Sequence, residues 1–215
     1  MRTHSRSHNS RLALAGLGVM AALVALSSNA QPTRPADASV RDDAAAGAIH
    51  AVDFTTVAQP GSACADALED APPRLIAVES GASQLLDTDS LTQLEVDADV
   101  LYGDLDGDGA DEAVVQAVCN YGANGAQQTV QVWTVDRRVP VLLDTITAPP
   151  SEAAGELIPG VSGVAIDGTE ISVTWTHYTD DDPNCCPSQQ TVVRYALDGD
   201  ELATVGRPVT GPIEP

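Results

Sequence analysis

From about Ile49 onward, apolar and polar residues alternate with a period of two over short stretches, and pairs of turn-forming residues separate these stretches. Alternation of this kind sends one row of side chains to each face of a β-strand, and short turns join antiparallel strands into hairpins. Helical spacing of apolar residues is limited to one possible turn at Cys64–Leu68. The pattern therefore predicts an all-β single domain of antiparallel hairpins, with roughly nine to eleven short strands.

The clearest predicted hairpin joins Gly163–Ile166 to Thr169–Tyr178 through the turn Asp167-Gly168. An Asp-Gly pair tolerates the positive φ angles of a tight turn. The apolar residues of the second strand, among them Trp175, share one face, which we expect to be buried. The pattern does not distinguish a sandwich from an open barrel or a propeller-like sheet. Three further hairpins are expected, namely Leu75–Glu79 with Ser83–Leu86, Gln128–Val135 with Val139–Ile146, and Val192–Leu197 with Glu201–Val205.

The stretch 102–115, YGDLDGDGADEAVV, has the spacing of a calcium-binding loop. Carboxylates occupy positions 1, 3, 5 and 9 of a D-x-D-x-D-G-x-x-E pattern, and Gly109 at position 6 permits the sharp turn. Calcium takes six to eight oxygens at about 2.3–2.6 Å, and alternating carboxylates in a tight loop converge on one point, joined by a main-chain carbonyl at position 7. The predicted ligands are Asp104, Asp106, Asp108, Ala110 and Glu112.

The flanks of this loop predict strands rather than helices. Val96–Tyr102 alternates and is expected to enter the loop as a strand, whereas Ala113–Cys119 is apolar on both parities and is expected to leave as a buried strand. Position 12 is Val115 instead of the bidentate Glu of an EF-hand. The alternative is an acidic turn without an ion, but like charges about 5 Å apart repel by about 1 kcal/mol even in water. The sequence therefore favours a structural calcium ion in a strand–loop–strand unit.

The first thirty residues have the three parts of a secretory signal. Three arginines precede the apolar run Leu12–Leu26, and Ser28-Asn29-Ala30 supplies small residues for cleavage after Ala30. The apolar run is shorter than the ~20 residues that span a bilayer, so we expect no transmembrane segment in the mature chain. No cysteine lies directly after the run, where a lipid would be attached to a processed N-terminus, so we expect no lipid anchor. The predicted organisation is a signal peptide at 1–30, a disordered tether at 31–48, the β domain at 49–207 and a flexible tail at 208–215.

Charge narrows the classes of partner. The chain has 31 acidic and 10 basic residues, all of the latter arginine, for a net charge of −21. A pI near 4 argues against binding to nucleic acid or to an anionic membrane, both of which need clustered Arg and Lys. The predicted partners are therefore calcium and an unknown envelope or extracellular partner, and apolar residues at 43% are sufficient for a packed core.

Four cysteines in an exported chain are expected to form disulfides, with three possible connectivities. We favour Cys64–Cys119, which would tie the loop before Leu75 to the strand that leaves the acidic loop. The remaining choice is a vicinal Cys185–Cys186 bridge or crossed pairing of these two cysteines with the other pair, and the sequence leaves both open.

Residues 177–188, HYTDDDPNCCPS, form the most unusual loop. One interpretation is a functional site with His177 as base or ligand, Asp180, Asp181 and Asp182 as metal ligands, and Cys185–Cys186 as a rigid surface for a ligand. The other is a polar loop held by cysteine. The chain carries no G-x-S-x-G, H-E-x-x-H or phosphate-binding glycine motif. We therefore predict a non-enzymatic binding module, with a secreted hydrolase using His177 and its neighbouring aspartates as the alternative, and a redox role for Cys185–Cys186 as a third hypothesis.

Two resemblances accompany these motifs. The segment GDLDGDGADEAVVQAVC resembles the calcium loops of FG-GAP and related β proteins. Together with NCCPS near the C-terminus and the closing strand–Asp-Gly–strand, it also resembles the LppP/LprE-type exported proteins of actinobacteria, over roughly Asp53 to Val205. Those proteins are mostly of uncharacterised activity, so the resemblance implies an envelope location more than a chemistry. They carry a lipid-attachment cysteine that is missing here.

Overall fold

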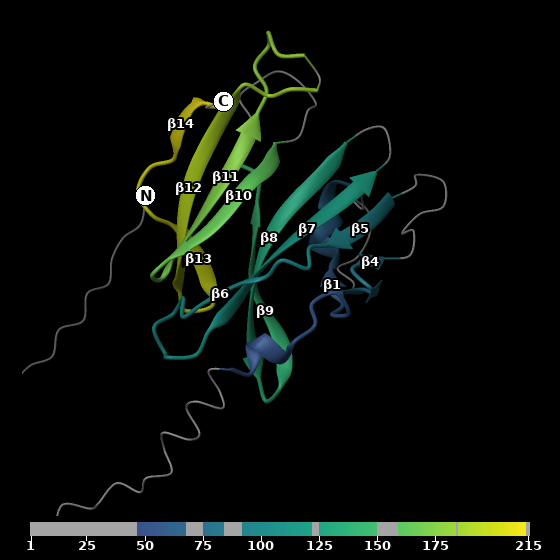
Figure 1. The fold of residues 1–215 in the computed structure, drawn as a ribbon, viewed down its shortest axis with the longest axis vertical. Coiled ribbons are helices and arrows are strands. Elements are labelled where there is room, and N and C mark those ends of the chain that lie inside the picture. Colours follow the sequence, from purple (N-terminus) through teal and green to yellow (C-terminus); the bar gives the residue numbers. More distant parts are fainter. Residues whose placement is uncertain are drawn as a thin grey trace, which may run out of the picture. The chain divides into compact units, whose positions relative to one another are not determined.

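The computed structural model describes residues 47–67, 75–83, 92–121, 125–149, 159–183 and 185–213. These residues form antiparallel β-sheets with no α-helix among them, which confirms the predicted all-β class (Figure 1). The described part of the chain contains no helix that is long and apolar enough to span a membrane. The predicted signal peptide, and the predicted tether up to residue 46, lie outside the described residues.

The larger sheet contains seven of the described strands, in the order β3-β4-β5-β7-β8-β9, and β6 pairs with β7 beyond the end of β5. All of the described pairs are antiparallel, and the three longest strands are β7 and β8 in the interior of the sheet and β9 at its edge. The strands of this sheet are β3 (Val78–Glu79), β4 (Ala82–Ser83), β5 (Thr92–Val96), β6 (Leu101–Gly103), β7 (Glu112–Tyr121), β8 (Ala126–Asp136) and β9 (Val139–Thr147).

The smaller sheet contains five described strands in the order β10-β11-β12-β13, with β14 also paired to β12. Its strands are β10 (Gly160–Asp167), β11 (Glu170–His177), β12 (Gln189–Asp198), β13 (Glu201–Thr204) and β14 (Val209–Pro212). A two-stranded ribbon and two short 3-10 helices complete the described fold, namely β1 (Gln59–Pro60), β2 (Leu75–Ile76), η1 (Ile49–Ala51) and η2 (Gly61–Ala67). The strands outnumber the nine to eleven expected because several of them are only two residues long.

Two hydrophobic cores lie on opposite faces of the larger sheet. The N-terminal segment packs Ile49 and Phe54 against one face, which presents Val115, Ala117 and Trp133 from β7 and β8. The other face packs against the smaller sheet. This second core combines Val114, Val130, Val132 and Ile146 with Leu105, Ile171, Val173, Trp175 and Val193. Because the first half of β7 is covered on both faces, Ala113, Val114 and Val115 are all buried, as the sequence predicted for a largely buried strand.

The turns of the last two hairpins lie one residue later than predicted. Asp167 pairs with Glu170, so the two-residue turn is Gly168-Thr169, and the next hairpin turns in the same way at Gly199-Asp200. The glycine comes first in each turn, with φ of 62° and 69° respectively. A two-residue turn with glycine in the first position suits the twist of a hairpin, which explains the shift.

The predicted strand Val96–Tyr102 is interrupted. β5 ends at Val96 and pairs with the second half of β7, whereas β6 begins at Leu101 and pairs with the first half. Between them the chain leaves the ladder after the Asp97 N–H donates to the Gln116 carbonyl at 2.9 Å. The alternation of residue types continues through this break, so the sequence pattern does not reveal it.

The prediction of a flexible tail at 208–215 is wrong for β14. Residues 189–192 of β12 pair with β14, and residues 195–198 pair with β13. β13 is too short to cover the whole edge of β12, so the C-terminal segment returns to satisfy the remaining backbone groups. The Ile213 N–H also donates to the Ser188 carbonyl at 2.9 Å.

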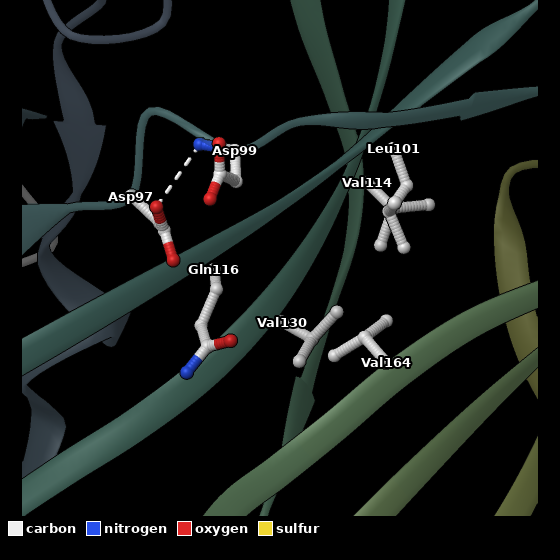
Figure 2. Close-up of a pocket in the computed structure, with 7 residues that line it drawn as sticks. All are labelled: Asp97, Asp99, Leu101, Val114, Gln116, Val130 and Val164. Atoms are coloured by element: carbon white, nitrogen blue, oxygen red, sulfur yellow. Dashed lines mark hydrogen bonds between the residues drawn. The ribbon is translucent and has the colours of Figure 1, made fainter.

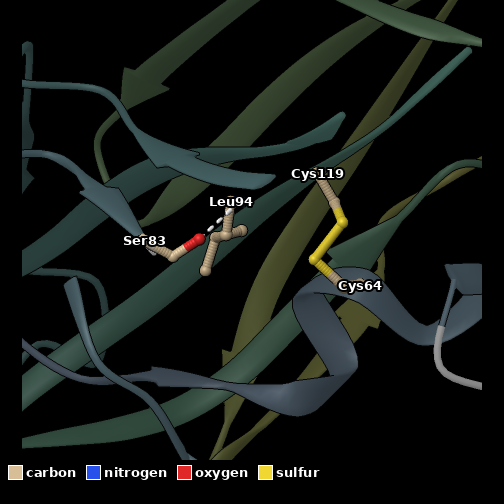
Figure 3. The surroundings of a disulfide bond; sticks show 4 residues. All are labelled: Cys64, Ser83, Leu94 and Cys119. Carbon is tan, nitrogen blue, oxygen red and sulfur yellow. Dashed lines mark hydrogen bonds between the residues drawn. A yellow bond between two sulfur atoms is a disulfide. The ribbon is translucent and has the colours of Figure 1, made fainter. Parts of the chain in front are cut away.

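The favoured Cys64–Cys119 disulfide is confirmed. Cys64 of η2 is bonded to Cys119 of β7, with the Cα atoms 5.3 Å apart, and both residues are fully buried (Figure 3). Cys185 and Cys186 form the vicinal disulfide, which excludes the crossed pairing. The Cys64–Cys119 bridge therefore attaches the segment that contains η1 and η2, which we call the N-terminal cover, to the larger sheet.

Candidate metal centre

The acidic loop joins β6 to β7 and lies against the second core through Leu105, which is 2% exposed. Gly107 and Gly109 have φ of 79° and 91°, a left-handed conformation that glycine adopts without steric cost. These two glycines let the loop coil within a few residues. Carboxylates two and four residues apart are thereby brought to one side of the loop.

The structure brings three of the predicted ligands together. Carboxylate oxygens of Asp104, Asp106 and Asp108 all lie within 4.8 Å of one another. Two oxygens bound to one calcium ion at about 2.3–2.6 Å are at most about 5 Å apart. The observed spacing is therefore that of ligands around a single cation of this size.

Backbone hydrogen bonds hold these carboxylates in place. Asp104 accepts from the Gly107 N–H at 2.8 Å and, through its other oxygen, from the Gly109 N–H at 3.2 Å. Asp106 Oδ1 accepts from the Asp108 N–H at 2.9 Å, and Asp108 Oδ1 accepts from the Ala110 N–H at 2.7 Å. Asp106 and Asp108 therefore each keep one oxygen outside these backbone bonds. The role of the Ala110 carbonyl as a ligand stays a prediction.

Glu112, the fourth predicted carboxylate ligand, stands at the base of the loop and is 2% exposed. Its Oε2 accepts from the Leu105 N–H at 2.9 Å. Burial raises the pKa of this carboxyl to about 7, the Leu105 N–H opposes the rise, and the charges of Asp106 and Asp108 add to it. Glu112 thus lies within the electrostatic reach of the aspartates but outside their close group.

His50 links the N-terminal cover to this loop, a connection that the sequence analysis missed. Its Nε2 lies 2.8 Å from Asp111 Oδ2, and its ring stacks on Tyr102 with the centroids 4.0 Å apart. The Asp111 carboxylate therefore has His50 as its hydrogen-bond partner. Because 61 residues separate the two partners, no local pattern could have indicated the contact.

Asp182 organises the loop 177–188. Its Oδ2 accepts from the Thr179 N–H at 2.8 Å and from both the N–H and the hydroxyl of Ser188 at 3.0 Å. The Thr179 N–H and the Ser188 groups lower the pKa of this carboxyl. Asp182 therefore connects the two ends of the loop by hydrogen bonds to Thr179 and Ser188. The exposed Cys185–Cys186 bridge lies between Asp182 and Ser188 in the sequence.

His177 begins a chain of hydrogen bonds through two threonines of neighbouring strands. Its Nε2 hydrogen-bonds Thr191 Oγ1, which in turn hydrogen-bonds Thr210 Oγ1 at 2.7 Å. Within the described residues, no carboxylate forms a hydrogen bond or ion pair with the His177 ring. The chain of contacts connects β11, β12 and β14, which is a structural arrangement rather than an acid–base pair.

Burial lowers the pKa of His177. An unfolded histidine titrates near 6.5, so as the pH falls through that value the unfolded chain takes up the proton more readily than the folded chain. The contribution of His177 to the free energy of unfolding therefore decreases between about pH 7 and pH 5, whereas Glu112, whose pKa is raised to about 7, contributes in the opposite direction. We expect the free energy of unfolding of His177→Gln, relative to that of the unmodified protein, to rise as the pH falls over this range. Urea unfolding of both proteins at the two pH values measures the difference. An equal change of the free energy of unfolding with pH in the two proteins would contradict the prediction.

A family model described as LppP/LprE lipoprotein matches residues 145–200. The match runs from the end of β9 to the β12–β13 turn, roughly a quarter of the chain, and it includes the loop with the vicinal disulfide. The resemblance expected from the sequence is thus confirmed over this region, while the likeness of the acidic loop to FG-GAP loops stays a prediction. No curated protein and no solved structure matches the chain.

Proposed function

We propose that this protein is an extracytoplasmic β domain in which the acidic loop binds one structural calcium ion, and that it serves as a binding module of the cell envelope rather than as an enzyme. The envelope location is supported by the matching lipoprotein family and by the expected signal peptide. The calcium site is supported chiefly by the convergence of the Asp104, Asp106 and Asp108 carboxylates within 4.8 Å. Release after Ala30 without a lipid anchor is part of the same proposal.

The ion would stabilise the domain because the loop is continuous with both sheets. β6 and β7 pair directly before and after it, and Leu105 enters the core between the two sheets. Three clustered carboxylates repel one another without a counter-ion, and a divalent cation would turn that repulsion into attraction. Asp104, Asp106 and Asp108 would bind it, with Glu112 and the Ala110 carbonyl as the remaining protein ligands. The ion would thereby hold β6 against β7.

Calcium is expected to raise the melting temperature of the exported form. For a Kd of about 10⁻⁴ to 10⁻³ M, typical of extracellular modules, about 10 mM calcium should stabilise the fold by about 1.4 to 2.7 kcal/mol. In a chain of this size that corresponds to a rise of roughly 3 to 10 °C. Asp106→Ala should abolish the rise because it removes one of the three clustered carboxylates. Scanning calorimetry with and without a chelator measures both proteins.

Asp180→Ala is the matched control, because it removes an exposed carboxylate outside the loop and should leave the calcium effect unchanged. Calorimetric titration of the unmodified protein should give saturable heat at one site. A melting temperature that does not respond to millimolar calcium, or a response that survives in Asp106→Ala, would exclude this site.

The hydrolase alternative receives no support from the described contacts. His177 bonds to Thr191, and Asp182 uses its Oδ2 to close its own loop. Among the described contacts, no carboxylate orients the His177 ring as it would in a catalytic pair, and Asp182 Oδ2 already accepts three hydrogen bonds. The binding-module proposal is therefore the one that we retain.

A further inference from the structure

The break between β5 and β6 opens a cavity of about 170 Å³ at the side of the sandwich (Figure 2). Three polar residues, Asp97, Asp99 and Gln116, line one part of it. The rest of the lining is apolar and comes from β6, β7, β8 and β10, with the residues Leu101, Val114, Val130 and Val164. The cavity thus has a carboxylate side and a hydrocarbon side, and Figure 2 shows the two sets of side chains as separate groups.

The polar side carries negative charge without a partner of opposite sign. Asp97 Oδ1 accepts from the Asp99 N–H at 3.0 Å, which fixes the Asp97 carboxylate beside the cavity. Neither aspartate forms an ion pair with an arginine in the described part of the chain. Both aspartates are exposed, whereas Gln116 is half-buried. The open charge is therefore available to a cation from outside the protein.

The size and the lining limit what can enter. Sites for drug-sized ligands and cofactors occupy about 300–1,000 Å³, so a cavity of about 170 Å³ holds a much smaller group. The exposed Leu101 and the half-buried Val164, which lie over the buried Val114 and Val130, offer apolar surface to a short hydrocarbon chain. The aspartates suit a cationic head at the end of that chain. Inorganic cations would gain nothing from the hydrocarbon wall, and neutral alcohols could donate one hydrogen bond to a carboxylate but would lack the ionic attraction.

We propose that this cavity binds an alkylammonium group, with the ammonium between Asp97 and Asp99 and the carbon chain along Leu101, Val114 and Val164. The chain itself contains no lysine, so the group comes from a different molecule, either a free aliphatic amine or a lysine side chain of another protein. The site is separate from the acidic loop and does not depend on calcium binding there.

Titration of the ¹⁵N-labelled exported form followed by NMR tests the proposal. The buffer contains excess calcium and about 0.15 M salt, at which unspecific attraction is screened beyond about 8 Å. We expect n-butylammonium to shift the amide signals of residues 97–101 and 114–116 and of Val164 in a saturable way. The neutral isostere 1-butanol should bind about tenfold more weakly, because it lacks the charge.

The variant Asp97→Asn/Asp99→Asn should bind n-butylammonium about tenfold more weakly, while the asparagine oxygen can still accept the Asp99 backbone N–H. Asp180→Asn/Asp181→Asn removes the same charge from another exposed loop and should bind as the unmodified protein does. Equal binding of the alcohol, unchanged binding by the first variant, or an equal loss in the second would overturn the proposal. Binding of n-butylammonium together with Nα-acetyl-lysine amide supports the site with lysine as the source, and binding of n-butylammonium alone supports it with a free amine.

Discussion

Removing the Cys64–Cys119 disulfide is expected to lower the free energy of unfolding by about 4 kcal/mol. The bridge closes a loop of 55 residues, and in the chain-entropy model a loop of this size restricts the unfolded chain by about that amount. Both half-cystines are fully buried against the larger sheet, so the change also loosens the cover formed by η1 and η2. Urea unfolding of Cys64→Ala/Cys119→Ala, compared with the unmodified protein, measures the loss.

The vicinal bridge supplies an internal control. Cys185 and Cys186 are adjacent and exposed, so Cys185→Ala/Cys186→Ala relieves almost no restriction on the unfolded chain and should change the free energy of unfolding far less. Similar losses in the two variants would contradict the entropic explanation. A far-UV circular dichroism spectrum that keeps its β signal would show that the first variant is still folded, as a typical stability of 5–15 kcal/mol allows.

Trp175→Ala is expected to be the most disruptive single substitution in the second core, with a loss of about 3 to 5 kcal/mol. Trp175 of β11 is completely buried in the core between the two sheets and is the largest fully buried side chain among the described residues. Truncation to alanine removes the apolar contacts and leaves a cavity that the two opposing sheets cannot close without moving. Chemical denaturation monitored by circular dichroism gives the difference.

Trp175→Phe keeps an aromatic ring in the same place and should cost much less than the alanine variant. Val209→Ala, on the 69% exposed side chain of β14, should cost little because burial is small there. If Trp175→Ala unfolds at the same urea concentration as Val209→Ala, the packing of the smaller sheet onto the larger one would have to be described differently.

The hairpins were predictable because their signals are local. A period of two and a glycine-containing turn place the β10–β11 and β12–β13 pairs to within one residue. The break after Val96 was not predictable, because leaving the ladder depends on the Asp97 N–H finding the Gln116 carbonyl, 19 residues away in the sequence. The strand β14 was also not predicted from the sequence. Its pairing depends on β13 being too short to cover the whole edge of β12, which no local pattern indicates.

The candidate metal site was likewise predictable only in part. The convergence of Asp104, Asp106 and Asp108 follows from their spacing and from glycine, so the sequence predicts it. The burial of Glu112 depends on how the loop packs against the second core, and the engagement of Asp111 depends on a histidine in η1. The alkylammonium cavity could not be anticipated at all, because its walls come from both sheets.

The pairing of β14 with β12 also bears on how the domain is best produced. A gene fragment that stops at residue 207 would delete β14 and leave residues 189–192 with unsatisfied backbone groups along an open edge. Open edges invite pairing with other molecules, so such a fragment should oligomerise or aggregate. Recombinant material for the measurements above should therefore extend at least through Ile213, and affinity tags placed after that residue will start beside the Ser188 end of the disulfide loop.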